Sequence, residues 1–387
     1  MQRSFLVFEN SIKSQETLKR YKYYLDIFIK FFHLKDYDSL AAMDSKQLQV
    51  MVEDYVMDLK KRVNPNSVPT YINPLQTFLD VNENEIKWKK IKRLFPAKIK
   101  TTGRKAYSRE DIARMLDLEP KQRNRVIIHI LASAGMRKGA LHDLRIKHLK
   151  KMEHDCYSFL VYAGSTEEHW SFLTPEASKE LDLYLEKRKN DGEKLNGNSP
   201  VLRMTYQIGL QKVRPMSDKS VDQTVERIVK RARLREKTGN RYDKMLNHGF
   251  RKRFETILKM NKEIPVAVSE KLIGHKAYYD DRGNHIQLDD NYFVPEVEQL
   301  FKFFQKIIPE LTIDDSQRWK IKTALLETEN DKLQLDTVKN SELVKIQQKH
   351  EEEKEEMRCS LKMYVAKMKS IEKRLDNIYL HISKNKD

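Results

Sequence analysis

The sequence predicts a mainly helical protein with a small β-sheet, an α+β chain built from more than one domain. Its 387 residues include only 11 glycines and 11 prolines, well below average usage of roughly 7% and 5%. This scarcity excludes collagen-like and low-complexity chains and disfavours turn-rich all-β folds. Apolar residues recur three and four positions apart through most of the chain, which is the spacing of amphipathic helices. At roughly 100 to 200 residues per domain, the length accommodates two or three domains.

Residues 1–98 are predicted to form a small helical domain. Apolar residues at helical spacing predict four helices, at 14–33, after Ser45, after Asn66 and at 85–95. Pro74 lies in the third of these, where it would either kink the helix or mark its start. The fourth helix, EIKWKKIKRLF, combines an apolar stripe with five Lys and Arg residues. We expect the stripe to face the core and the basic side to face outward.

A basic linker is predicted at 99–107. The segment PAKIKTTGRKAY, which ends at Tyr107, carries four basic residues, one Gly and one Pro between two helical patterns. This composition is typical of an exposed connection between domains. Two interpretations remain open, a solvated hinge and a strap that lies along a phosphate backbone.

Residues 108–315 are predicted to form a second, larger domain. Ser108 is placed to cap a helix that has two acidic residues in its first turn. The nearly all-apolar helix at 123–135 must lie at the centre of a core, and Gly135 ends it. Aromatic and β-branched runs at 156–164 and 169–175 predict a β-hairpin. Further helices are predicted at 176–189, 219–233 and 249–260.

Residues 316–387 are predicted to form a long solvated helix that ends in a short coiled coil. Apolar residues spaced alternately four and three apart mark a heptad seam. They are Met357, Leu361, Tyr364, Met368, Ile371, Leu375, Ile378 and Ile382. The alternative is an amphipathic helix that folds back on the preceding domain.

Charge and cysteine content narrow the class of protein. Lys and Arg number 74 against 57 Asp and Glu, a net charge of +17, which favours a polyanionic partner, most often nucleic acid. The two cysteines, Cys156 and Cys359, are far apart, so a disulfide scaffold and a CxxC metal site are excluded. No apolar run approaches the roughly 18 to 20 residues that span a bilayer, and the N-terminus lacks a signal-peptide pattern. We therefore expect a cytoplasmic protein with no membrane partner.

Three residues have the chemistry of a phosphate site. Arg137 follows the apolar helix directly, where a guanidinium can be held rigidly and still meet a phosphate. His248 and Arg251 stand three apart at the start of a helix and therefore share a face. Phosphoryl transfer needs fixed cationic donors and a group that exchanges a proton near neutral pH, which Arg and His supply. Taken alone, Arg137 is more simply interpreted as an exposed arginine at a helix start.

Two further candidates follow in the chain. His275 comes directly after Gly274, which is predicted to end a short helix in KLIGH. Tyr292 lies between an Asp-Asp-Asn cap and a helix that begins at Pro295. Each is weak by itself, because a lone histidine is usually structural and the chain has 17 tyrosines.

The ordered set is more informative than its members. In order and approximate spacing, the set resembles the signature of the tyrosine recombinases, the phage-type integrase family. The set consists of Arg137, a β-hairpin, His248-x-x-Arg251, Gly274-His275 and Tyr292. The resemblance covers about residues 10–312, with the basic helical segment up to Lys98 similar to the core-binding domain and Ser108 to about Thr312 similar to the catalytic domain. The closing segment, 288–313, is most similar to the archaeal integrase branch.

The resemblance implies a reaction and a role for each residue. Tyr292 would attack a scissile DNA phosphate, form a 3′-phosphotyrosyl link and free a 5′-hydroxyl. Arg137 and Arg251 would hold the nonbridging oxygens, His248 would exchange the tyrosine proton, and His275 would support the phosphate or the nucleophile. Neither ATP nor a metal ion nor another cofactor is implied.

The implied partners are double-stranded DNA and further copies of this chain. Strand exchange requires several protomers, so a tetramer in the synapse is expected, with coiled-coil contacts from the tail as a possible contribution. Lys252 and Arg253 are interpreted as nonspecific phosphate contacts.

Two departures from the family pattern leave other functions open. The family commonly has a lysine in the β-hairpin as a general acid, whereas the turn here is GSTEEHW. His169 or a lysine from elsewhere would have to replace it, or activity would be low. The acidic residue often found three after the first arginine is Ala140 here, with Asp143 as a possible replacement.

Two alternatives are therefore retained. One is a type IB topoisomerase, which uses the same Arg, His and Tyr chemistry but rejoins the same strand. The other is a noncatalytic DNA-binding architectural protein, a decayed integrase assembled by its coiled coil.

Overall fold

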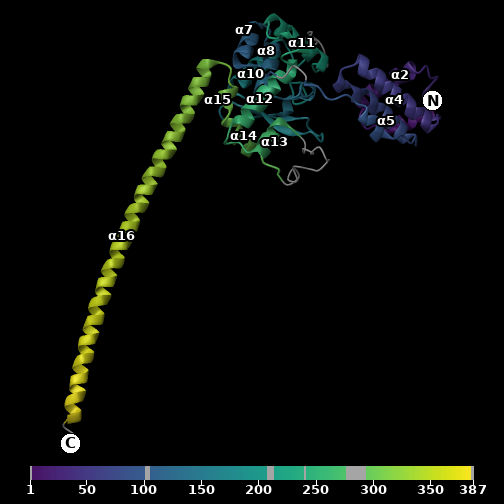
Figure 1. Cartoon of the computed structure of the whole chain (residues 1–387). Coiled ribbons are helices and arrows are strands. Elements are labelled where there is room, and N and C mark those ends of the chain that lie inside the picture. Colours follow the sequence, from purple (N-terminus) through teal and green to yellow (C-terminus); the bar gives the residue numbers. More distant parts are fainter. Residues whose placement is uncertain (1, 101–104, 207–212, 239–240, 276–292, 385–387) are drawn as a thin grey trace. The chain divides into compact units, whose positions relative to one another are not determined.

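The chain folds into two compact units, Met1–Thr102 and Gly103–Asp387, each described here by itself (Figure 1). The computed structural model describes residues 2–100, 105–206, 213–238, 241–275 and 293–384. Most of these residues are helical, and one small three-stranded antiparallel sheet lies in the second unit. The predicted fold class, mainly helical with a small sheet, is confirmed. The division between the units falls inside the segment 99–107.

The first unit is entirely helical. Its elements are α1 (Arg3–Ser11), α2 (Gln15–Phe31), α3 (Tyr37–Ala41), α4 (Ser45–Arg62), the 3₁₀ turn η1 (Pro65–Ser67), α5 (Val68–Val81) and α6 (Trp88–Arg93). Helix α2 begins where expected, because the Ser14 side chain accepts a hydrogen bond from the Thr17 amide. Asp44 caps α4, and Pro74 lies inside α5.

Aromatic rings fill the core of the first unit. Phe28 meets Tyr55 edge to face, with 5.0 Å between the ring centroids, and both side chains are buried. Such pairs contribute roughly 0.5–1.5 kcal/mol beyond the area they bury. In the basic helix α6, Ile91 is buried and Lys90 forms an ion pair with Glu53 at 2.7 Å. The apolar stripe of that helix therefore faces the core, as predicted.

The second unit combines helices with a short sheet. Its elements are α7 (Arg109–Asp117), α8 (Gln122–Ala134), α9 (Ala140–Asp143), the 3₁₀ turn η2 (Ile146–His148), β1 (Leu149–Lys151), β2 (Tyr157–Val161), β3 (His169–Leu173), α10 (Pro175–Asn190), α11 (Asp218–Arg231), β4 (Lys237–Thr238), β5 (Arg241–Tyr242), α12 (Leu246–Met260), α13 (Val266–Ile273), α14 (Val297–Gln305), α15 (Ile308–Leu311) and α16 (Asp315–Lys384). Ser108 and Asp111 form a capping box at the start of α7, as predicted.

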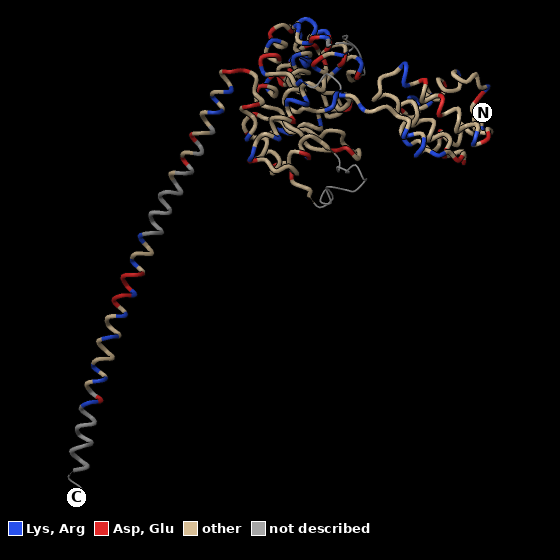
Figure 2. Tube along the Cα trace, viewed as in Figure 1, with Lys and Arg blue, Asp and Glu red and all other residues tan. Residues whose placement is uncertain are grey.

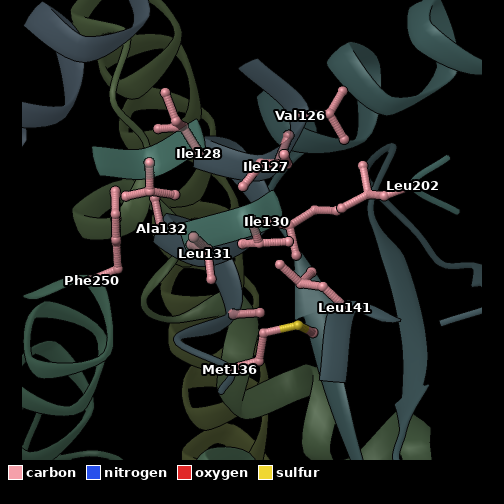
Figure 3. Close-up of a cluster of buried hydrophobic side chains, with 14 of the residues drawn as sticks. Val126, Ile127, Ile128, Ile130, Leu131, Ala132, Met136, Leu141, Leu202 and Phe250 are labelled. Atoms are coloured by element: carbon pink, nitrogen blue, oxygen red, sulfur yellow. The ribbon is translucent and has the colours of Figure 1, made fainter. Parts of the chain in front are cut away.

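Helix α8 is the centre of this core (Figure 3). Ten of its 13 residues are buried, and it packs between α10 and α12. Gly135 ends the helix with φ 56°, and a Cβ at this position would lie 2.5 Å from the Phe254 ring on α12. Only glycine therefore allows α8 to end against α12. This close approach determines where the next residues of the chain emerge.

The predicted hairpin is present and a third strand extends it. Strands β2 and β3 pair antiparallel with Tyr157 opposite Leu173 and Val161 opposite His169. Strand β1 pairs with β2, with Leu149 opposite Phe159. Sequence analysis did not predict β1, because three residues are too few to show an alternating pattern.

One predicted DNA contact is a structural residue. Arg253 is only 7% exposed, and its guanidinium donates to the backbone carbonyls of Glu310, at 2.6 Å, and Leu311. The interpretation of Arg253 as a phosphate contact is therefore wrong. Beside it, the buried carboxylate of Glu176 accepts hydrogen bonds from the amides of Ile313 and Asp314. These two side chains hold the segment from which α16 leaves the core.

Helix α16 is a single helix of 70 residues. Lys, Arg, Asp and Glu residues occur along the described part of its length (Figure 2). Ile321, near its start, packs against the core cluster formed by α12, α13 and α14. Among the described helices, none is long and apolar enough to cross a membrane.

The buried His129 of α8 makes stability depend on pH. Its side chain is 6% exposed, and burial, reinforced by the charge of Arg125, lowers its pKa to about 3. The unfolded chain has a histidine pKa near 6.5, so between about pH 6.5 and 3 the unfolded state binds one more proton than the folded state. Stability therefore falls as pH falls through this window, by up to about 1.4 kcal/mol per pH unit.

Substitution His129→Gln should remove this dependence. We expect the opening free energy of α8 amides, from hydrogen exchange corrected for intrinsic rates at each pH, to fall less steeply between pH 6.5 and 4 than in the unaltered chain. His350→Gln, at an exposed position on α16, serves as the control and should leave the slope unchanged. Equal slopes in the His129 variant and the unaltered chain would contradict the prediction.

Candidate active site

Three of the predicted site residues lie around one cavity of about 450 Å³ in the second unit. Arg137, His248 and Arg251 all line it. They come from the segment after α8 and from the first two turns of α12. The structure therefore brings together residues that are more than 100 positions apart in the sequence.

Arg251 is the most deeply held of the three. Its residue is 8% exposed, and its guanidinium donates to the carbonyl of Gly135 at 3.1 Å and to that of Ile273 at 2.9 Å. These carbonyls lie at the C-terminal ends of α8 and α13, where backbone acceptors lack helical partners and the helix dipole favours a cation. Burial and the nearby Arg137 lower the pKa of Arg251. The side chain is therefore fixed before any ligand binds.

Arg137 is more accessible. Its side chain is 41% exposed, with Nη1 3.6 Å from the Glu167 carboxylate and 3.4 Å from the carbonyl oxygen of Gly274. An exposed ion pair at this distance contributes little to stability. Arg137 can therefore exchange these partners for an anion in the cavity at small cost.

His248 lies in the first turn of α12, which begins at Leu246 and not at Gly249 as predicted. Partial burial lowers the pKa of its imidazole, and the charges of Arg251, Lys252, Arg137 and Lys138 lower it further. The neutral ring is therefore favoured near pH 7, so one ring nitrogen can accept a proton.

His275 is held beside the same helix end as Arg251. Gly274 ends α13 with φ 68°, as predicted, and the His275 ring nitrogen Nδ1 lies 2.5 Å from the Glu270 carboxylate. A carboxylate partner on Nδ1 orients the ring and favours the tautomer with its proton on that nitrogen, which leaves Nε2 as the other functional atom.

The hairpin that joins β2 and β3 also places a residue, His169, beside the end of α13. His169, the first residue of β3, has its Nδ1 2.9 Å from the carbonyl of Glu167. A Cβ on Gly274 would lie only 2.2–2.5 Å from the His169 ring atoms, so the ring packs directly on the end of α13. Burial lowers the pKa of His169, and Arg251 and Arg137 contribute to the same shift.

Four polar residues that line the cavity with the arginines were not predicted as site residues: Lys138, Tyr162, Asp222 and Asn247. Lys138 forms an ion pair with Asp222 of α11, and Asn247 donates to the other carboxylate oxygen of Asp222 at 2.6 Å. Tyr162 has φ 52°, a conformation rare for residues other than glycine. The position of Lys138 directly after Arg137 was a usable signal, whereas nothing in the sequence marked Tyr162 or Asp222.

The remaining predicted residues are placed as follows. Tyr292 lies outside the described residues. Ala140 is buried and Asp143 is exposed at the end of α9. Among the described residues, Arg137 forms an ion pair with the carboxylate of Glu167. Within the described part of the chain, no group of three His, Cys, Asp or Glu side chains is arranged to hold a metal ion.

Comparison with protein families identifies the class to which this region is similar. Residues 107–279 match the model of the phage integrase family. The matched region contains Arg137, His248, Arg251 and His275, and it ends before Tyr292. No curated protein sequence matches the chain.

Several solved structures resemble the chain in fold. The XerH site-specific recombinase bound to its difH substrate is 19% identical, with 62% of this chain and 66% of that chain covered and a TM-score of 0.45. A lambda integrase dimer bound to a COC′ core site is 16% identical, with 73% and 92% covered and a TM-score of 0.47. The integrase of the Tn1549 transposon, in complex with transposon right end DNA, is 12% identical, with 76% and 96% covered and a TM-score of 0.48. Identities this low do not carry over the function of any of these proteins.

The contact between Gly274 and His169 can be tested by adding one methyl group. We expect Gly274→Ala to displace the His169 ring and to change its NMR ring signals and its pKa. The matched control is Gly192→Ala, because φ there is also positive, at 86°, yet nothing lies within 4 Å of the added Cβ. Both variants should lose roughly 1–2 kcal/mol from backbone strain, but only the first should change His169. Identical His169 signals in the two variants would contradict the contact.

Proposed function

We propose that the protein is a tyrosine-type site-specific DNA recombinase, an integrase that cuts and rejoins DNA strands through a 3′-phosphotyrosyl intermediate. One observation carries the proposal, the convergence of Arg137, His248 and Arg251 on a single cavity within a region that matches the phage integrase family. Within this class, the sequence of 288–313 favours the archaeal branch.

The chemistry that we propose requires no external energy source. The Tyr292 phenol oxygen forms a bond to the scissile phosphorus while the bond from phosphorus to the 5′-oxygen breaks. His248 takes the phenolic proton, and the departing 5′-oxygen gains one from a general acid. In the reverse step a 5′-hydroxyl from another strand attacks the phosphotyrosine, which restores the phenol and completes the exchange.

Arg137 and Arg251 suit the stabilisation of the pentacoordinate phosphate. Each guanidinium offers several N–H donors to the nonbridging oxygens, where negative charge develops in the transition state. Arg251 is already oriented by two backbone carbonyls, so little reorganisation is needed. His275, oriented by Glu270, would offer Nε2 as a hydrogen-bond acceptor to the hydroxyl of the nucleophile.

Lys138 is our candidate for the missing general acid. It lines the same cavity as both arginines and has a 40% exposed side chain. The lowered pKa of His169 favours its neutral form, which is the wrong state for donating a proton. We therefore assign the proton on the 5′-oxygen to Lys138 and a positioning role at the end of α13 to His169.

The two folded units would divide the work of binding DNA. We assign 1–98 to a DNA-binding core-binding domain, 99–107 to a basic linker, 108–315 to the catalytic domain and 316–387 to a long helix with a coiled coil. Phosphate neutralisation by basic residues would supply most of the affinity, so binding should weaken with salt by about 0.9 log units per contacted phosphate for each tenfold increase. Strand exchange would involve duplex DNA and a tetramer of the chain in the synapse.

The phosphotyrosyl step is tested with nicked suicide duplexes made from the DNA that flanks the gene. The nick lets a short strand diffuse away after cleavage, which traps the covalent complex. We expect an adduct that survives denaturation in the unaltered protein and is lost in Tyr292→Phe. Tyr206→Phe is a control for the loss of one phenol. Absence of the adduct in the unaltered protein would leave only the noncatalytic alternative, and relaxation of supercoils without exchange between two sites would favour a topoisomerase.

The role of Lys138 predicts a rescue experiment. Lys138→Gln should slow cleavage of a normal phosphodiester by roughly 10²–10⁴-fold, the usual contribution of a general acid. A substrate with sulfur in place of the bridging 5′-oxygen has a leaving group that departs without protonation, so its cleavage should be nearly unaffected. Lys187→Gln, at an exposed position of α10, controls for the loss of one positive charge. If Lys138→Gln slows the cleavage of both substrates equally, Lys138 is not the general acid.

A further inference from the structure

The described part of α16 leaves a row of large apolar side chains in water. Met357, Leu361, Tyr364 and Met368 are 71%, 67%, 72% and 59% exposed. Their spacing places them on one face of the helix, and the sequence continues the same spacing through Ile371, Leu375, Ile378 and Ile382. A helix in water normally depends on packing of its apolar face for stability. This face therefore requires a partner.

We propose that the partner is the same face of further copies of this chain, aligned parallel and in register, so that residues 357–382 form an assembly site that operates without DNA. In heptad positions, Leu361 and Met368 are at a, and Met357 and Tyr364 are at d. This inference goes beyond the proposed function because it concerns the free protein and requires no catalysis.

The flanking charges select the parallel arrangement. In a parallel coiled coil each g residue faces the e residue of the next heptad in its neighbour. This places Glu353 opposite Arg358 and Lys367 opposite Glu372, two attractive pairs, and the described side chains of all four residues are exposed. In an antiparallel pair that overlaps the same seam, g faces g, and Lys367 meets the Arg374 position, which is repulsive.

The core residues favour more than two chains. Leucine at a combined with isoleucine at d shifts coiled coils from dimers toward trimers and tetramers. Leucine occupies two of the four a positions (361 and 375) and isoleucine two of the four d positions (371 and 378), and the other seam positions are Met368 and Ile382 at a and Met357 and Tyr364 at d. A parallel tetramer satisfies this pattern and would already supply the number of chains that we propose for the synapse.

Charge reversal in the full chain tests the alignment, with mass measured by light scattering in the absence of DNA. The unaltered chain should have the mass of four copies. Lys367→Glu should weaken assembly by placing Glu opposite Glu372, and Lys367→Glu with Glu372→Lys should restore it. Lys362→Glu, the same charge change at the outward b position, is the matched control. Stronger assembly in Lys367→Glu would indicate the antiparallel alternative and overturn the proposal.

Disulfide trapping provides an independent test of register. A cysteine at d lies beside its own copy in a parallel assembly, whereas an antiparallel overlap of 357–382 would separate the two copies of residue 357 by roughly 37 Å, at 1.5 Å per residue. Met357→Cys in a Cys359→Ser background should therefore form a covalent dimer with oxidised glutathione. The native Cys359, exposed and at the outward f position, should not.

Outcomes of these tests are separate from the outcome of the DNA cleavage test. A monomeric full chain, or crosslinking through Cys359 but not through Cys at 357, would overturn the assembly site even if the phosphotyrosyl adduct forms. Leu361→Glu with Met368→Glu should give a monomer that still forms that adduct. A parallel crosslink with a dimeric mass would support the alignment and overturn the four-chain core.

Discussion

The buried guanidinium of Arg251 is the contact on which the rest of the site depends. It joins the carbonyl at the end of α8 to the carbonyl at the end of α13, while its own backbone belongs to α12. Both ends are closed by glycines with positive φ, Gly135 and Gly274, which let the chain turn away so that the carbonyls can meet one cation. The same side chain therefore satisfies two helix ends and presents a preorganised cation to the cavity.

The positive charges around this guanidinium are only partly compensated by nearby carboxylates. Arg137 and Lys138 add positive charge at the cavity, and the carboxylates of Glu167 and Asp222 pair with them at its edge. The combined positive charge, together with burial, lowers the pKa values of His248 and His169. The arrangement suits a phosphate, because its anionic oxygens can replace the carboxylates while a neutral histidine remains free to accept a proton.

The hairpin is where this chain departs most from the family that its central region matches. Its turn carries Glu167 and His169 in place of the expected lysine, and both contact residues of the site or lie beside them. Lys138, which directly follows Arg137, lines the cavity from the α8 side. An element other than the hairpin can therefore place a cation in this cavity. For proton donation, the position of the cation matters, and the loop that carries it does not.

The sequence by itself determined most of the helices, the hairpin and the order of the candidate site residues, because apolar periodicity and capping residues are local signals. It proposed Arg137, His248, Arg251 and His275 as candidates through their spacing, but it took Arg253 for a phosphate contact, because a basic residue on a helix has the same local sequence signal whether it faces DNA or the core. Only the tertiary structure places the first beside the cavity and the second against the carbonyls of α15. Packing likewise decided that Lys138, Tyr162 and Asp222 line the cavity. Their positions depend on elements that are distant in sequence and meet only in the folded unit.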